Sequence, residues 1–80
     1  MKYNIGDRVV PVRKTIWGKK LSQSVLWNQA KKIKQKFLYV TGINVEDFSG
    51  MVIPYRAHSF KDSESGDYFK ESDLKPYVEK

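Results

Sequence analysis

The chain has 80 residues, enough for one small domain with a thin hydrophobic core. It contains no cysteine, which excludes a disulfide framework and a thiolate metal site, and no apolar run approaches the ~20 residues that cross a bilayer. Residues 1–7 lack the apolar core of a signal peptide. We therefore expect a soluble, cytoplasmic, monomeric protein without a membrane partner.

The net charge of +6 is distributed unevenly along the chain. Residues 1–43 hold ten Lys or Arg residues and a single acid, Asp7, whereas residues 44–80 hold five Lys or Arg residues and eight acids. A basic surface attracts polyanions and speeds their encounter with the protein. The alternative is that the lysines only keep a small protein soluble.

Residues 5–13 indicate a turn followed by a strand. Gly6–Asp7 has turn chemistry, and Pro11 removes one ladder donor, so the strand should lie at an edge or end near that residue. The core candidates in this strand are Ile5, Val9 and Val12.

Residues 14–36 form a long segment for so small a domain. Trp17–Gly18 indicates a turn, and a helix is predicted over about residues 22–34, with Ser22 or Ser24 as its N-cap. Its lysine-rich last turn suits the negative end of the helix dipole. The spacing predicts one apolar face made of Leu26, Ala30 and Ile33.

Residues 37–43 are the longest run of β-branched and aromatic residues and predict the central strand of an antiparallel sheet. Gly42 suggests a bulge or bend. Strict alternation would place Leu38 and Val40 on one face, and Phe37, Tyr39, Thr41 and Ile43 on the other.

The rest of the chain predicts short elements separated by turns. Pro54 and Pro76 each favour an edge or a bulge in their strands. The expected elements are a strand over 51–57, a polar loop over 58–66, a short strand over 66–69, one helical turn over 71–74 and a closing edge strand over 75–78.

Two motifs resemble the SH3-like small β-barrel family. Residues 5–9 are similar to its Gly-Asp-x-Val opening, and residues 68–78 are similar to its strand, 3₁₀ turn and closing strand. The resemblance implies a mainly β, five-stranded antiparallel barrel over 1–80, with a short helix inserted in the first long loop at about residues 22–34 and a single 3₁₀ turn near 71–74. The layout also resembles small uncharacterised proteins of Gram-positive bacteria and their phages.

The chain departs from the SH3 domains that bind proline-rich peptides. Leu74 stands where their closing turn carries a groove tyrosine, and residues 51–55 lack their tryptophan. Their Ala-Leu-Tyr-Asp-Tyr signature is absent as well. We therefore expect the barrel without proline-rich peptide binding, because a fold alone does not transfer a function.

No motif predicts an enzyme, a cofactor or a metal. The single histidine, His58, falls in the predicted polar loop and is interpreted as a solvated side chain. Asp62, Glu64 and Asp67 do not match a calcium loop. A Gly-rich phosphate loop and a Gly-x-Ser-x-Gly motif are also missing.

The basic segment is the strongest functional candidate. Lys and Arg neutralise phosphates and aromatic faces stack on unpaired bases, so the segment predicts binding of nucleic acid or a nucleoprotein. On a helix the lysines would point in different directions and form a collar, and the two tryptophans could instead be core anchors. The predicted binding residues are Arg13, Lys14, Lys19, Lys20, Lys31, Lys32, Lys34, Lys36, Trp17 and Trp27.

The competing hypothesis is a protein–protein interaction module or a phage-type inhibitor of a host protein. It would use exposed aromatics as a hot-spot patch. The candidates for this patch are Tyr39, Tyr55, Phe60 and the two tryptophans. An aromatic cage for a methylated lysine is a third possibility. The sequence leaves open DNA, RNA or protein as the partner, and also the strand form.

Overall fold

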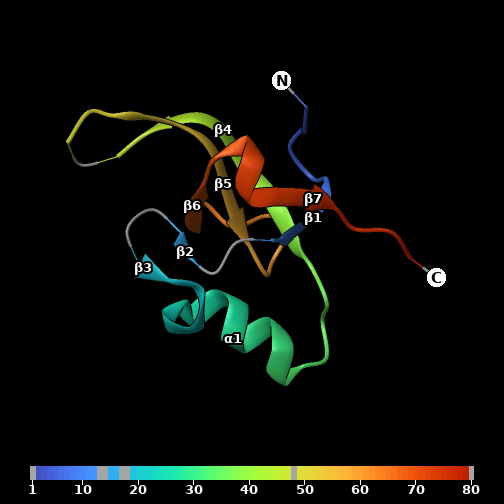
Figure 1. The fold of residues 1–80 in the computed structure, drawn as a ribbon. Helices are drawn as coiled ribbons and strands as arrows, with labels where there is room; N and C mark the ends of the chain where they lie inside the picture. Colours follow the sequence, from blue (N-terminus) through green and yellow to red (C-terminus); the bar gives the residue numbers. More distant parts are fainter. Residues whose placement is uncertain (1, 13–14, 17–18, 48, 80) are drawn as a thin grey trace.

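The computed structural model describes residues 2–12, 15–16, 19–47 and 49–79. Five strands form one antiparallel sheet in the order β6-β5-β4-β1-β7 (Figure 1). Its strands are β1 (Arg8–Pro11), β4 (Leu38–Glu46), β5 (Val52–His58), β6 (Asp67–Phe69) and β7 (Leu74–Pro76). A second sheet, not predicted, pairs β2 (Thr15–Ile16) with β3 (Lys19–Lys20), and the predicted turn at Trp17–Gly18 lies outside the described residues. The mainly β class is confirmed.

β4 is the central strand, as predicted. It pairs with β1 on one side and with β5 on the other. The register shifts between Val40 and Gly42, which confirms the bulge, and a Cβ on Gly42 would lie 2.8 Å from Val45 Cγ1.

The bulge corrects the predicted faces of β4. Val40 pairs with Ala57 and Ile43 pairs with Tyr55, and residues that pair directly share a face. Ile43 therefore packs on the core with Val40, although strict alternation placed it on the opposite face. The inserted residue shifts the pleat by one position.

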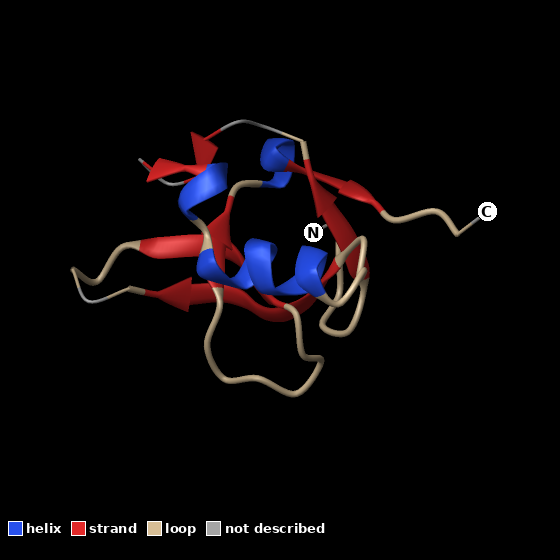
Figure 2. Cartoon of the chain, turned by 90° about the horizontal axis from the view of Figure 1, so that it is seen from below, coloured by secondary structure: helices blue, strands red, loops and turns tan. Residues whose placement is uncertain are grey.

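The helix α1 runs from Val25 to Lys32, so the predicted span of 22–34 was too long. The 3₁₀ turn η1 (Leu21–Gln23) precedes it, and Ser24 is the N-cap. α1 lies at one end of the sheet, and in the view from below it lies in front of the strands (Figure 2). Within the described part of the chain, no helix has the length and apolar character needed to span a membrane.

The face that α1 turns to the core is narrower than predicted. Ala30 is fully buried and Leu26 is half-buried, but Ile33 is 63% exposed. The helix ends at Lys32, so Ile33 caps it and does not continue its apolar stripe. Its assignment to the buried face was wrong.

The core is built around aromatic rings from distant parts of the chain. Tyr3 is buried, and its ring meets that of Tyr55 edge-on at 5.3 Å. The Tyr3 hydroxyl donates a hydrogen bond to the Leu74 carbonyl oxygen at 3.2 Å. The other buried members of this cluster are Val9, Ala30, Leu38, Val40, Ala57 and Phe69. Of the predicted core residues in the first strand only Val9 is correct: Ile5 and Val12 are exposed, and Tyr3 takes the place beside the sheet.

The sheet has β6 and β7 as its two edges, so it is not closed and the predicted barrel is not confirmed. The 3₁₀ turn η2 (Glu71–Asp73) joins these edge strands, as predicted for about this position. β7 is an edge strand, as Pro76 predicted. Pro54 comes before the residues of β5 that pair with β6, so the edge of β5 that faces β6 has no pairing partner at Pro54.

His58 corrects another prediction. It ends β5 and is only 8% exposed, so it is not a solvated loop side chain. Its Nδ1 accepts a hydrogen bond from the Phe60 backbone N–H at 3.0 Å, and the two rings stack at 5.4 Å. These contacts give His58 a structural role at the start of the 59–66 loop.

Candidate nucleic-acid interface

A shallow groove of about 500 Å³ lies between β1, α1 and the segment that follows α1. We call it the Trp27 groove; its lining residues are Val10, Trp27, Lys31, Lys34, Gln35 and Lys36. Four of these were predicted from the sequence as binding residues. The groove combines an apolar floor with a cationic rim.

The N-terminus of α1 is fixed by Ser24, which positions Trp27. The Ser24 hydroxyl oxygen accepts a hydrogen bond from the Trp27 backbone N–H at 3.1 Å. The same hydroxyl donates to Asp67 Oδ2, which ties α1 to β6. Trp27 is half-buried and packs against the core, so the core prediction is correct for part of its ring while another part lines the groove.

The C-terminus of α1 turns sharply and presents Lys34 to the groove. Lys34 has φ of 60°, in the left-handed region. Its N–H bonds to the Lys31 carbonyl oxygen at 3.0 Å, and the Gln35 N–H bonds to the Ala30 carbonyl oxygen at 2.8 Å. This pair of bonds is the Schellman motif, which usually carries glycine at the left-handed position.

The Gln35 side chain holds the segment after the helix in place. Its Nε2 donates to the carbonyl oxygens of Phe37 and Ser59, both at 2.9 Å. The first bond closes a turn around the rim residue Lys36, and the second attaches the segment to the loop after β5. The lysines on either side of Gln35 therefore project from a constrained backbone.

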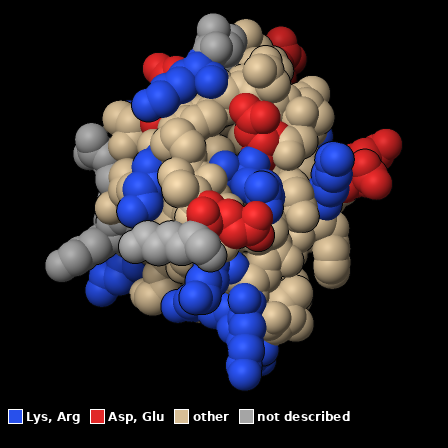
Figure 3. Space-filling model, turned by 90° about the vertical axis from the view of Figure 1, so that its right-hand side faces the viewer, with Lys and Arg blue, Asp and Glu red and all other residues tan. Residues whose placement is uncertain are grey.

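The electrostatics of the groove are uniformly cationic. Residues 8–45 contain no Asp or Glu. Lys31, Lys34 and Lys36 are exposed, and Lys32 is also exposed but does not line the groove. In the face seen in Figure 3, the lower part carries Lys and Arg side chains, and the acids lie above it.

Several other predicted residues are not brought to this groove. Lys20 is exposed in β3, and Lys19 lies beside it in the same strand. The remaining predicted residues fall outside the described part of the chain; they are Arg13, Lys14 and Trp17.

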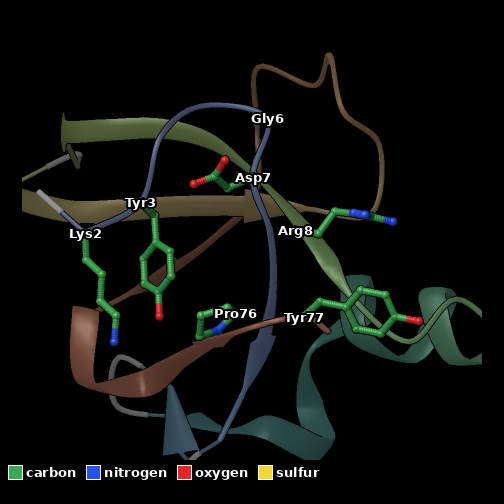
Figure 4. Close-up of a pocket in the computed structure, with 7 residues that line it drawn as sticks. All are labelled: Lys2, Tyr3, Gly6, Asp7, Arg8, Pro76 and Tyr77. Carbon is green, nitrogen blue, oxygen red and sulfur yellow. The ribbon is translucent and has the colours of Figure 1, made fainter. Parts of the chain in front are cut away.

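A second group of aromatic side chains lies near the groove; of its members only Tyr39 was a predicted site residue, as a candidate for the protein-binding patch. The Phe37 ring lies 5.1 Å from that of Tyr39 and 4.8 Å from that of Tyr77. The Arg8 guanidinium carbon lies 5.4 Å from the Phe37 ring centre and 5.6 Å from that of Tyr77. Figure 4 shows Arg8 and Tyr77 pointing to the same side, away from Tyr3 and Lys2, at one end of a pocket of about 400 Å³. We call Phe37, Tyr39, Tyr77 and Arg8 the aromatic platform.

The aromatics predicted for a protein-binding patch are not equivalent. Tyr55 is fully buried, and its hydroxyl accepts hydrogen bonds from the backbone N–H groups of Lys2 and Tyr3, so it cannot belong to an exposed patch. Tyr39 is half-buried in the platform. Phe60 is 64% exposed and stacks on His58.

Comparisons of the chain with protein-family models, with curated proteins and with solved structures give no match. Within the described ranges, no three His, Asp or Glu side chains are grouped so as to hold a metal ion. The chemistry of the Trp27 groove is that of a cationic rim around an indole face. Ammonium groups neutralise phosphates, and an indole face stacks on a planar base.

Proposed function

We propose that this chain is a small non-catalytic binding module that engages nucleic acid, free or in a nucleoprotein, through the Trp27 groove. The observation that carries the proposal is the placement of Lys31, Lys34 and Lys36 around the half-buried ring of Trp27. Solubility alone requires lysines on a surface but not their convergence on an aromatic groove. The lack of any acid in residues 8–45 adds to the attraction of a polyanion.

We also propose that the sheet curls into an SH3-like barrel. β6 ends at Phe69 and β7 begins at Leu74, so an extended chain between their Cα atoms would reach at most about 18 Å. The 3₁₀ turn between them shortens that reach, which brings the two edges of the five-stranded sheet toward each other. β2, which follows β1 in the chain, also lies against β6, at the other side of the sheet from β7.

Fluorescence anisotropy with labelled single- and double-stranded DNA and RNA tests the function. A double variant, Lys31→Gln with Lys34→Gln, removes two rim charges, and Lys2→Gln with Lys61→Gln removes two exposed charges outside the groove. We expect the rim variant to weaken binding and to lower the log–log salt slope for single strands by about 1.4, at about 0.7 per lost phosphate contact. The control variant should leave most of the affinity and the slope in place.

Two results would contradict the proposal. One is binding that vanishes for every nucleic acid at physiological salt. The other is an equal loss of affinity in the rim and control variants, because that pattern reflects net charge and not a site. A protein ligand held by a dry aromatic patch would show a shallow salt response instead.

A further inference from the structure

The outer face of β1 connects the Trp27 groove to the aromatic platform. Val9 and Pro11 are buried, so Arg8 and Val10 alternate with them and face outward. Arg8 pairs with Tyr39 of the platform, and Val10 lines the groove. The two features are therefore neighbours on one face of the molecule.

β7 adds a further cation to this face. Val10 pairs with Lys75, which is exposed, and paired residues project to the same side of a sheet. The chain then continues to Tyr77, whose N–H bonds to the Arg8 carbonyl oxygen at 3.0 Å. Cations thus lie on both sides of a path from Trp27 to Tyr77.

We propose that the ligand of this face is a single-stranded nucleic acid that places one base on Trp27 and another on the Phe37–Tyr77 end of the platform. Its backbone would run past Lys36 and Lys75 to Arg8. The inference rests on the proposed function and specifies its ligand. Aromatic faces separated along a cationic path are the usual means of holding unpaired bases without reading their sequence.

The β1 residues that border the two stacking positions, Arg8 and Val10, lie close together along the strand. Arg8 and Val10 are two residues apart on β1, a rise of about 6.7 Å. In a duplex the base faces are covered by neighbouring pairs, and only the phosphates could reach the same side chains.

Glu79 marks the position that a phosphate would take at Arg8. Its Oε1 lies 3.7 Å from Arg8 Nη1, and its side chain is 70% exposed, so the pair is held weakly. A phosphate oxygen can replace this carboxylate on the guanidinium without disturbing the cation–π contacts with Phe37 and Tyr77.

The experiment compares four probes: oligothymidylate, oligouridylate, a DNA duplex of equal charge, and inorganic polyphosphate as a competitor without bases. We expect both single strands to bind at least tenfold more tightly than the duplex, and polyphosphate to compete poorly. Tyr77→Leu should weaken single-strand binding by about 5- to 150-fold, the range for loss of one stacked base. Tyr68→Leu is the control, because it removes a half-buried tyrosine ring on β6, which β5 and β4 separate from β1 in the sheet order.

Trp27 packs on the core, so a fluorescence measurement on the intact ring replaces its mutation. In a Trp17→Phe chain Trp27 is the single tryptophan, and stacking of thymine should quench its emission in step with the anisotropy. One outcome overturns this inference and leaves the proposed function standing: all probes bind and binding depends on Lys31 and Lys34, but Trp27 emission is not quenched and Tyr77→Leu has no effect. Absence of binding to every probe overturns both.

Discussion

Ser24 is the residue that links α1 to the sheet. It caps α1 through Trp27 and donates to Asp67 on β6. We expect Ser24→Ala to lower the free energy of unfolding by about 1–2 kcal/mol. The substitution removes the acceptor of the Trp27 N–H at the start of the helix, and it also removes the hydrogen bond to Asp67 of β6. Chemical denaturation measures the loss. Ser22→Ala is the control, since Ser22 is exposed and, within the described part of the chain, it accepts the Asn28 side-chain hydrogen bond through its backbone oxygen, which the substitution keeps; equal losses in the two variants would refute this role.

Glu79 is the residue expected to compete with the ligand. Glu79→Gln should tighten oligothymidylate binding about two- to fivefold, which corresponds to the modest energy of an exposed ion pair, with little change in stability. Anisotropy titrations at physiological salt give the ratio. Glu46→Gln makes the same charge change at the end of β4. If it tightens binding as much as Glu79→Gln does, the effect comes from net charge and not from Arg8.

The sequence could identify single residues only where local spacing decides their place. Trp27 and Lys31 are four apart on a helix, so their common face was predictable. Arg8, Phe37 and Tyr77 come together through the pairing of β1 with β4 and β7, which no local pattern encodes. The sequence of β1 gives no alternation there, because Val9 and Val10 are the same residue type although one is buried and the other faces outward. His58 and Tyr3 were missed for the same reason, because their burial depends on tertiary contacts.

At the scale of elements, the turn that ends α1 places the charged residue Lys34 where glycine would give a more stable fold. Lys34 adopts a left-handed conformation, which costs a residue with a side chain about 1–2 kcal/mol. Glycine would avoid this cost, but its greater freedom in the unfolded chain would cancel part of the gain. We expect Lys34→Gly to raise the free energy of unfolding by up to about 1 kcal/mol and to weaken nucleic-acid binding. Denaturation and anisotropy on one preparation measure both effects. Lys32→Gly is the control, since it lies in the helix and should be destabilising; a destabilised Lys34→Gly chain would show that the turn is not strained.

The order of the elements in the main sheet and of α1 was predictable because each of these carries a local signal. β-branched runs marked β1, β4 and β5, prolines marked strand ends and edges, and two candidate N-caps, Ser22 and Ser24, marked the approximate start of α1. Two features were not predictable. The β2–β3 pair has only two residues per strand, too few for a periodic pattern, and the bulge at Gly42 reversed the faces after Val40.

At the scale of the whole molecule, the charge asymmetry of the sequence survives folding only in part. The two halves of the chain interleave in the sheet, because β4 pairs with both β1 and β5. The basic character persists at the end of the molecule formed by α1 and the segment that follows it, where the lower part of the face in Figure 3 carries Lys and Arg side chains. The insertion of this basic helical segment between β1 and β4 therefore decides where the positive charge is concentrated, and we expect a polyanion to bind there.

Both halves of the proposed path depend on β1, so ligand binding should stabilise the whole fold and not only the helix. An oligothymidylate at about 100 times its Kd should add about 2.7 kcal/mol to the free energy of unfolding by mass action. For a domain of this size, that corresponds to a rise in Tm of about 10–20 °C. Thermal unfolding followed by far-ultraviolet circular dichroism and by Trp27 emission in the Trp17→Phe chain should show one coincident transition that moves with ligand. The Lys31→Gln, Lys34→Gln variant should shift much less at the same concentration. If the ligand shifts the transition seen by Trp27 emission but not the one seen by circular dichroism, the ligand binds α1 without β1. In that case the path to the aromatic platform is not used.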